Sequence, residues 1–402
     1  MKLTSKQLIQ LEDKFSAKNY HPLDVVITRG QGVWVYDVDG KKYMDFLSAY
    51  SALNQGHVHK KILKAAKQQL AKLTLTSRAF RNEQFGLFCK EICQLAGFEM
   101  VLPMNSGAEA VETAIKAARK WGYLKKKVKK NKAEIITCEN NFHGRTISIV
   151  SFSTEKQYRD GFGPFTQGFK IVKYGDIEAI KQAVTKNTVG VLIEPIQGEA
   201  GIIMPPKGYL SAVAKICKKN NILLMLDEIQ TGLGRTGKLF AYQHEDKAKP
   251  DMLILGKALS GGFYPVSVVL ANKKVLGVFN PGDHGSTFGG NPLAGAIARS
   301  ALKVIQEEKL VDNAAKMGNY LKSRLKTIKS SWIKEIRGIG LLIGIELTKA
   351  SGGARPFCEA LKAEGILCKE THKTVLRLAP PLIINKNQVD MAFEKIKKVL
   401  EK

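Results

Sequence analysis

The sequence contains no apolar run long enough to span a membrane, no internal repeat and few acidic residues. A membrane-spanning helix needs about 20 mostly apolar residues, and a typical apolar run here, Ile222–Leu226, is far shorter. The six cysteines form no CxxC pair and no Cys/His spacing that suits zinc, so we expect reduced thiols and no metal site. Residues 1–15 carry charges of both signs and no apolar stretch, which argues against a secretory signal. These absences exclude integral membrane and disulfide-rich secreted proteins and predict a cytoplasmic location.

Positive charge is the one unusual bulk property. The chain has 63 Lys and Arg against 36 Asp and Glu, a net charge of +27. Such a surface attracts anions, including nucleic acids and acidic metabolites. The densest cluster has no interleaved aromatic residues and is typical of an exposed loop; it consists of Lys125, Lys126, Lys127, Lys129, Lys130 and Lys132. Because no recognition motif accompanies the charge, we expect neither a nucleic-acid partner nor a membrane partner.

The length of 402 residues is enough for two or three domains, and the sequence patterns divide it into three zones. Residues 1–48 contain a hairpin pattern around Asp39-Gly40 and are expected to join a small domain. Residues 49–291 alternate helical patterns with short apolar runs, which predicts a large α/β domain. Residues 292–402 predict a smaller α+β domain, completed by the N-terminal zone.

Four apolar runs in the large zone lack polar alternation, as parallel strands covered on both faces do. They are Ile135–Thr137, Val189–Ile193, Ile222–Leu226 and Met252–Leu255. The last zone opens with a long helical pattern from Pro292 to about Ile328. Since ligands of parallel α/β sheets bind at the carboxyl ends of the strands, the residues that follow these runs are the first functional candidates.

The stretch Gly232–Leu239 matches two nucleotide-binding patterns imperfectly. Its glycines form a GxGxxG, but they do not follow a strand directly as a dinucleotide site requires. It also approaches a P-loop, but Leu239 replaces the serine or threonine that binds magnesium. We therefore interpret it as a glycine-rich turn that positions its neighbours.

Asp227 and Lys257 follow two of the apolar runs. If the two strands are parallel neighbours, both side chains lie at the same edge of the sheet. Burial lowers the pKa of a lysine and makes it a nucleophile toward carbonyl carbons. The spacing alone leaves open a simple ion pair between the two residues.

A helical pattern that begins after Asn105-Ser106 provides a further element. Ser106 and Glu109 fit a capping box, which by itself explains them. The small residues there also expose the first backbone N–H groups of the helix, which attract phosphate. A Schiff-base lysine, a buried acid and a phosphate site together are the pattern of a pyridoxal phosphate enzyme.

Six ordered motifs resemble those of class III aminotransferases over essentially the whole chain. They are Asn105–Ala110, Asn141–Arg145, Glu194–Glu199, Leu226–Gly232, Gly256–Gly262 and His284–Gly290. Within that class the chain most resembles the ornithine aminotransferases, on the segments Asn19–Pro22, Phe46–His57, Leu73–Phe80 and Leu376–Leu382. The resemblance implies the type I fold of pyridoxal phosphate-dependent transferases, with a mostly parallel, seven-stranded sheet between helices and a smaller α+β domain.

The resemblance also implies the residues that hold pyridoxal phosphate. Lys257 carries the cofactor and Asp227 keeps its pyridine nitrogen protonated. Phe142 stacks on the ring, and Ile229 and Gln230 line its other side. The backbone N–H groups of Ser106, Gly107 and Ala108 hold the phosphate, and Thr287 is contributed by the second subunit of a homodimer with shared sites.

For the substrates, the resemblance implies two arginines and a switch. Arg145 binds the carboxylate far from the reacting amine, and Arg377 binds the α-carboxylate of glutamate or 2-oxoglutarate. Glu199 masks Arg377 while ornithine reacts at its δ-amino group, and releases it for 2-oxoglutarate. Tyr20 recognises the α-amino group of ornithine, with Tyr50 beside it.

The implied reaction converts L-ornithine and 2-oxoglutarate into glutamate and glutamate 5-semialdehyde, which cyclises to pyrroline-5-carboxylate. Freed Lys257 acts as general base and acid. The alternatives are sister enzymes that use acetylornithine, 4-aminobutyrate or lysine. Two readings of another class are a basic nucleic-acid-binding protein and a nucleotide-dependent oxidoreductase.

Overall fold

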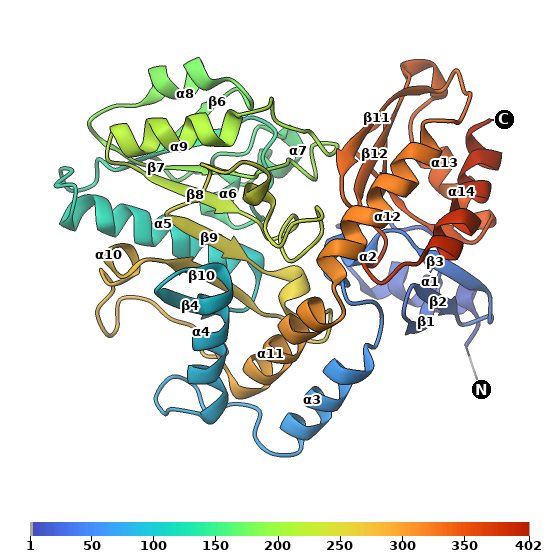
Figure 1. Ribbon diagram of the computed structural model, residues 1–402, viewed down its shortest axis with the longest axis horizontal. Coiled ribbons are helices and arrows are strands. Elements are labelled where there is room, and N and C mark those ends of the chain that lie inside the picture. The colour runs from blue at the N-terminus through green and yellow to red at the C-terminus, as the bar shows by residue number, and fades with distance from the viewer. Residues whose placement is uncertain (1–2, 402) are drawn as a thin grey trace.

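The computed structural model describes residues 3–401. Residues 1–2 of the zone 1–48 and residue 402 of the zone 292–402 lie outside the described residues. Its centre is a seven-stranded sheet in the order β4-β10-β9-β8-β7-β5-β6 (Figure 1). β10 is antiparallel to both of its neighbours, and the remaining pairs are parallel. The strands are β4 (Met100–Met104), β5 (Glu134–Cys138), β6 (Phe169–Val172), β7 (Thr188–Ile193), β8 (Leu223–Asp227), β9 (Met252–Leu255) and β10 (Ser267–Ala271). The expected mostly parallel, seven-stranded sheet is confirmed.

The four apolar runs form the buried middle of this sheet, β5, β7, β8 and β9. Alternate side chains of one strand point to opposite faces. In β8, Leu224 and Leu226 pack into one core, and Leu223 and Met225 pack into the other. Runs without polar alternation are therefore required, because helices cover the sheet on both sides.

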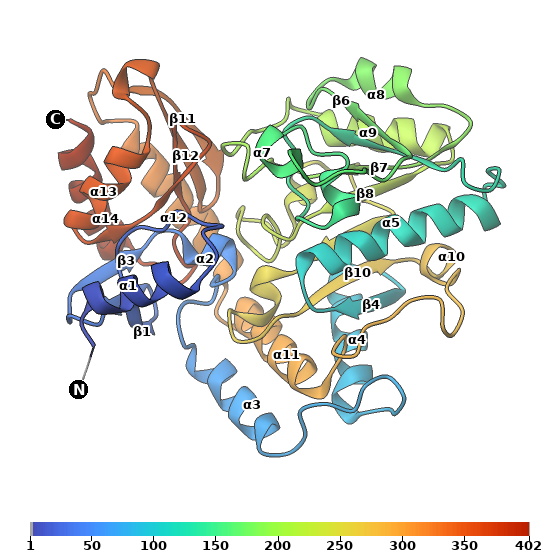
Figure 2. The same ribbon diagram turned by 180° about the vertical axis from the view of Figure 1, so that it is seen from behind.

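The helices of the two covering layers pack on opposite faces of the sheet (Figures 1 and 2). α5 (Gly107–Leu124) crosses one face and contacts β7, β9 and β10. α9 (Tyr209–Lys219) lies on the other face against β8 and α8. The remaining helices of this region are α3 (Lys60–Leu70), α4 (Glu83–Ala96), α6 (Ile147–Val150), α7 (Lys156–Arg159), α8 (Ile177–Ala183) and α10 (Lys273–Leu276), with 3-10 turns η1 (Ala241–His244) and η2 (Lys257–Ser260).

Two four-stranded sheets lie beside the central one. The first has the order β1-β2-β3-β13, and the second has the order β11-β12-β15-β14. Their strands are β1 (Ile27–Gln31), β2 (Trp34–Asp37), β3 (Lys42–Asp45), β11 (Ile333–Ile339), β12 (Leu342–Leu347), β13 (Ile366–Leu367), β14 (Lys369–Thr371) and β15 (Val375–Leu378). The hairpin expected at Asp39-Gly40 is confirmed as β2–β3. Since β3 pairs with β13, the two ends of the chain share one sheet. The boundaries at residues 48 and 291 remain a prediction.

The single long helix expected from Pro292 to about Ile328 is wrong, because the structure contains two helices there. α11 (Pro292–Glu307) packs against α3 and α4, and α12 (Leu310–Leu325) packs against α14 (Lys386–Leu400). Lys309 adopts a φ of 50° between them, which a continuous right-handed helix does not allow. The other helical segments are α1 (Ser5–Phe15), α2 (Ser48–Ser51), α13 (Arg355–Ala363) and η3 (Lys349–Ser351). In residues 3–401, no helix has the length and apolar character that crossing a membrane requires.

The glycine-rich stretch Gly232–Leu239 is a turn that contacts the C-terminal region. Gly234 has a φ of 92°, in the left-handed region that favours glycine. Arg235 is fully buried and donates hydrogen bonds to the carbonyl oxygens of Leu341 (3.0 Å) and Pro380 (2.6 Å) and to Asn54 Oδ1 (2.5 Å). The turn thus connects the central sheet to the smaller sheets, as a positioning role predicts.

Candidate active site

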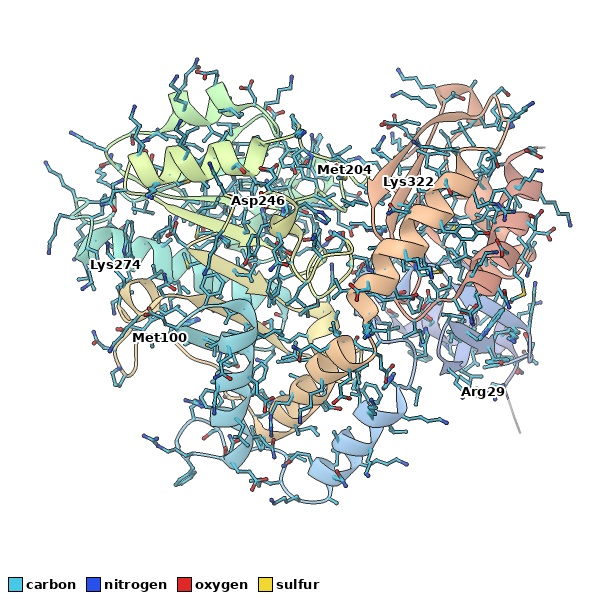
Figure 3. The ribbon with its side chains drawn as sticks, viewed as in Figure 1. Arg29, Met100, Met204, Asp246, Lys274 and Lys322 are labelled. Atoms are coloured by element: carbon cyan, nitrogen blue, oxygen red, sulfur yellow. The ribbon has the colours of Figure 1, made fainter. Side chains whose placement is uncertain are left out.

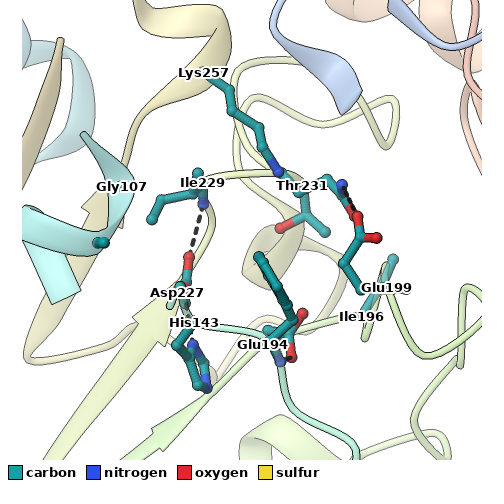
Figure 4. Close-up of a pocket in the computed structure, with 13 residues that line it drawn as sticks. Gly107, His143, Glu194, Ile196, Glu199, Asp227, Ile229, Thr231 and Lys257 are labelled. Atoms are coloured by element: carbon teal, nitrogen blue, oxygen red, sulfur yellow. Dashed lines mark hydrogen bonds and ion pairs between the residues drawn. The ribbon is translucent and has the colours of Figure 1, made fainter. Parts of the chain in front are cut away.

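A cavity of about 210 Å³ lies at the carboxyl ends of β7, β8 and β9. Its lining residues come from segments far apart in the sequence (Figure 4). They are Gly107, Ala108, Phe142, His143, Gly144, Glu194, Ile196, Glu199, Asp227, Ile229, Gln230, Thr231 and Lys257. The location is the one that the strand ends predict.

Asp227 ends β8 as a buried carboxylate with two hydrogen bonds. Its Oδ2 lies 2.7 Å from His143 Nδ1, and its Oδ1 accepts the backbone N–H of Ile229 at 3.0 Å. Burial alone would lower the pKa of His143, but the hydrogen bond and charge of Asp227 outweigh it and raise that pKa. His143 therefore holds a proton toward Asp227. A carboxylate has about four lone-pair positions, so Asp227 keeps acceptor capacity toward the cavity.

Lys257 follows β9 after a single glycine and extends its amine into the cavity (Figure 4). Its backbone has a φ of 44°, an uncommon left-handed conformation that costs of order 1–3 kcal/mol. Among residues 3–401, Nζ has no hydrogen-bond or ion-pair partner, so the Asp227–Lys257 ion pair left open by the sequence does not form. Burial lowers the pKa of Lys257 more than the charge of Glu199 raises it. The site thus favours a neutral, nucleophilic amine.

The N-terminus of α5 forms another wall of the cavity. The capping box is confirmed: Glu109 N–H donates to Ser106 Oγ at 3.2 Å, and Ser106 N–H donates to Glu109 Oε2 at 2.6 Å. The helix geometry leaves the first N–H groups without intrahelical acceptors. With Ser106 N–H engaged, Gly107 and Ala108 are the two predicted N–H donors that line the cavity. A side chain at Gly107 would approach Ile229 Cδ1 to 3.0 Å, so this wall is tightly shaped.

Glu199 and Arg377 form the expected pair beside the cavity. Arg377 Nη1 donates to Glu199 Oε1 at 2.5 Å, and Gln230 Nε2 donates to the same oxygen at 3.0 Å. Burial alone would raise the pKa of Glu199, but the charges of Arg377 and Lys257 and these hydrogen bonds lower it to about 2. Arg377 is 1% exposed. In this structure Glu199 therefore occupies Nη1 of the Arg377 guanidinium.

Tyr50 reaches the same arginine from a strained turn. Four consecutive residues, Ser48–Ser51, have φ values from 47° to 72°, and left-handed conformations cost about 1–2 kcal/mol per non-glycine residue. Asp45 Oδ1 accepts the N–H groups of Leu47 and Ser48, both at 2.8 Å, and so holds the start of the turn. As a result the guanidinium of Arg377 lies 4.8 Å from the centre of the Tyr50 ring. Burial raises the pKa of Tyr50.

The remaining predicted residues lie outside the cavity lining. Tyr20 is 68% exposed, and its phenol adds to the raised pKa of Tyr50. Arg145 is exposed, and its guanidinium lies 4.0 Å from the centre of the Tyr158 ring. Thr287 is exposed in the loop before α11, where neighbouring Ser286 accepts a hydrogen bond from Asn105 at 2.8 Å.

The sequence analysis assigned no role to His143 or Glu194. Glu194 follows β7 as Asp227 ends β8, so the strand-end rule could have found it. Its Oε2 accepts the N–H of Phe142 at 3.0 Å and so fixes the segment that carries Phe142. Burial raises the pKa of Glu194 to about 8, although nearby His143 opposes the rise. His143 lay inside a quoted motif, but no spacing rule linked it to Asp227.

Comparison with known proteins agrees with this geometry. Residues 15–400 match the family model of class III aminotransferases. The ornithine aminotransferase of Brevibacillus brevis is 58% identical over 98% of this chain and 98% of that protein. An ornithine aminotransferase structure from Toxoplasma gondii, with partial occupancy of pyridoxal phosphate at its active site, superposes with a TM-score of 0.97. It is 43% identical and covers 99% of this chain and 94% of its own.

A related enzyme named for another substrate is similarly close in structure. The acetylornithine aminotransferase of Elizabethkingia anophelis superposes with a TM-score of 0.91 at 49% identity, over 99% of both chains. The family match covers far more than half of the sequence. The chain therefore belongs to the class III aminotransferases.

Proposed function

We propose that the chain transfers the δ-amino group of L-ornithine to 2-oxoglutarate with pyridoxal phosphate as cofactor. The observation that carries this proposal is the arrangement around one cavity of a helix N-terminus, an unpaired buried lysine and a buried carboxylate. These are the partners of a phosphate, an aldehyde and a pyridine nitrogen. A side chain at position 107 would meet Ile229, so glycine keeps this wall of the cavity open.

The residues present therefore fit the cofactor. Gly107 and Ala108 would hold its phosphate, Asp227 its ring nitrogen and Lys257 its aldehyde carbon. Phe142 and Ile229 would flank the ring. When bound, the cofactor supplies an electron-withdrawing ring that stabilises negative charge on the substrate carbon.

The chain's own residues then perform the proton transfers. The Lys257 amine, whose pKa burial lowers, takes a proton from the δ-carbon of ornithine as general base and then delivers it as general acid. His143 Nδ1, 2.7 Å from Asp227 Oδ2, orients the Asp227 carboxyl group. Glu199 keeps Arg377 occupied while ornithine is present, so the guanidinium does not draw in the α-carboxylate.

In the second half-reaction Arg377 binds the α-carboxylate of 2-oxoglutarate, and Glu199 must leave it. A planar guanidinium binds a carboxylate through two parallel hydrogen bonds. Gln230, which already donates to Glu199, can hold the displaced side chain. Two residues are proposed for the α-amino and distal carboxylate groups of the substrates: Tyr20, whose phenol acts on the pKa of Tyr50, and Arg145, whose guanidinium lies 5.6 Å from the centre of the Phe142 ring.

A homodimer with shared sites is also proposed, in the cytoplasm. Phe288, next to Thr287, is 48% exposed, and Phe80 is 73% exposed. Asn82 donates to the carbonyl of Gly290 at 3.4 Å, which brings the loop of Thr287 beside the start of α4. Exposed aromatic residues on neighbouring segments suit a subunit interface. Mixing inactive Lys257→Ala and Thr287→Ala chains should restore activity if the sites are shared.

The decisive experiment is the absorption spectrum of the holoenzyme, before and after L-ornithine is added without 2-oxoglutarate. Conversion of the visible cofactor band to that of pyridoxamine phosphate is expected. A band that responds to glutamate or acetylornithine but not to ornithine would contradict the proposed donor. The Elizabethkingia relative makes acetylornithine the second candidate. If ornithine is the donor, Tyr20→Phe should lower the activity with ornithine and leave the activity with acetylornithine unchanged.

A further inference from the structure

The amino ends of the parallel strands, opposite the active site, carry a second and larger cavity of about 790 Å³. It lies between the end of α9, the start of β8, the loop before β9 and α10. We name it the basal cavity. Its volume lies in the range of about 300–1,000 Å³ that is usual for small-molecule sites. Figure 3 labels Lys274 of this region at the edge of the molecule away from the smaller sheets.

The rim of the basal cavity is strongly basic. Three segments supply its lysines: α9 gives Lys215 and Lys218, the loop before β9 gives Lys247 and Lys249, and α10 gives Lys274. Lys249 donates to the carbonyl of Gly97 at 2.9 Å. Within the described part of the chain, the other four ammonium groups form no hydrogen bond or ion pair.

One acidic residue, Asp251, lines the cavity beside these five lysines, so most of their charge is not neutralised. Asp251 Oδ2 accepts the backbone N–H of Leu224 at 2.9 Å, and burial raises the pKa of its carboxyl group, although this hydrogen bond and the charge of Lys274 oppose the rise. Lys215 and Lys218 are three positions apart on α9, where like charges repel. A concave surface lined by one sign of charge concentrates the field and attracts counter-ions. The arrangement is unfavourable without an anion and favourable with one.

The inner wall of the basal cavity is apolar. It consists of Trp121, Ile222, Leu223 and Val275, all buried. These side chains are only 2–4% exposed, so they leave little surface for an apolar part of a ligand, and the lysines are the groups that a ligand would meet. We propose that the basal cavity binds a polyphosphate group among its lysines.

This proposal gives a role to charge that the aminotransferase reaction does not use. The active site needs Lys257, Arg377 and Arg145, whereas the chain carries an excess of +27. The proposal does not depend on the amino donor, because the basal cavity lies at the opposite ends of the same strands.

Isothermal titration of the holoenzyme with ATP, without divalent cations and at physiological salt, tests the proposal. Inorganic triphosphate is the second probe. The matched variants are Lys215→Ala/Lys218→Ala in the basal cavity and Lys129→Ala/Lys130→Ala in the exposed loop, which remove the same charge. We expect one ATP or one triphosphate per chain, bound with similar affinity, which the first variant reduces about tenfold or more and the second leaves unchanged.

Three results would overturn the proposal. Absence of heat with about 1 mM ATP at two temperatures would exclude a site of near-millimolar affinity, because a binding enthalpy that is zero at one temperature is not zero at another. Equal weakening in both variants would show diffuse attraction to a basic surface. Binding of ATP without binding of triphosphate would show that the nucleoside, and not the lysine rim, carries the site.

Discussion

The two ends of the central sheet treat charge in opposite ways. At the carboxyl ends, Asp227 is matched with His143, and Glu199 with Arg377. At the amino ends, Lys215, Lys218 and Lys247 line the basal cavity and form no ion pair within residues 3–401. A buried charge without a partner is costly, whereas an exposed lysine is solvated. The comparison teaches that buried charges are given ion-pair or hydrogen-bond partners, as Arg235 is by carbonyl oxygens, whereas within residues 3–401 the amine of Lys257 has neither and so marks the candidate for the chemistry.

The largest expected change in activity is that of Lys257→Ala, which removes the unpaired amine at the carboxyl ends of the strands. The variant removes both the attachment point and the general base, and a general base alone contributes about 10²–10⁴-fold. We expect kcat to fall by at least about 10⁴-fold, measured with L-ornithine and 2-oxoglutarate. Lys129→Ala, in the exposed loop, is the control and should keep full activity. A Lys257→Ala enzyme with more than a hundredth of wild-type activity would contradict the assigned base.

His143→Ala tests whether pairing at the carboxyl ends is structural as well as catalytic. It leaves Asp227 buried without its cationic partner, and breaking such a pair costs about 3–5 kcal/mol. Urea unfolding of the apoprotein should show this loss. His244→Ala provides a control, because burial lowers the pKa of His244 and no carboxylate partners it. Equal stability losses in the two variants would show that the charge of His143 does not matter.

Unfolding in acid tests whether the ion pair of Glu199 with Arg377 stabilises the fold. Its folded pKa of about 2 lies below its ordinary 4.5, so the carboxylate stabilises the fold above about pH 5, and this contribution is lost as pH falls toward 2. The difference in unfolding free energy between wild type and Glu199→Gln should therefore be constant at neutral pH and shrink in acid. A difference that is independent of pH down to pH 2 would refute the paired state.

The smallest expected effect has the opposite sign and belongs to the amino ends. Lys215→Ala removes like-charge neighbours at Lys218 and Lys219 and should stabilise the protein by about 0.2–0.5 kcal/mol per pair. Lys181→Ala on α8 is the matched control, because Lys181 pairs with Glu178 at 3.3 Å. That variant should be slightly destabilised. Thermal unfolding of both, at low salt, measures the contrast, and two shifts of the same sign would contradict it.

Sequence reasoning succeeded where one local rule decides the structure. Both bounds of the strand Met252–Leu255 were predicted correctly, because a strand buried on both faces must be apolar. Asp227 and Lys257 were chosen because ligands bind at the carboxyl ends of parallel strands. The contact between His143 and Asp227 spans 84 positions and has no local signature. The break between the two helices at Lys309 was not predicted, because the helical pattern of the sequence continues through it.

The turn that carries Tyr50 and the basal cavity were missed for a further physical reason. Nothing in Ser48–Ser51 announces left-handed backbone, since no glycine is present and the conformation is imposed by contacts such as those of Asp45. The lysines of the basal cavity come from separate segments, and each alone is typical of a solvated surface. Only the folded arrangement brings these groups together.

Arg235 limits how the enzyme can respond to its two substrates. Its guanidinium joins the central sheet to Leu341 and Pro380 of the C-terminal region in a fully buried setting. A hinge motion between the regions would have to leave these carbonyl groups and the guanidinium without partners, at about 1–3 kcal/mol for each group. The scaffold is thus stiff at the point where many enzymes flex. The side-chain movement proposed for Glu199 needs no such hinge, because it would leave the backbone in place.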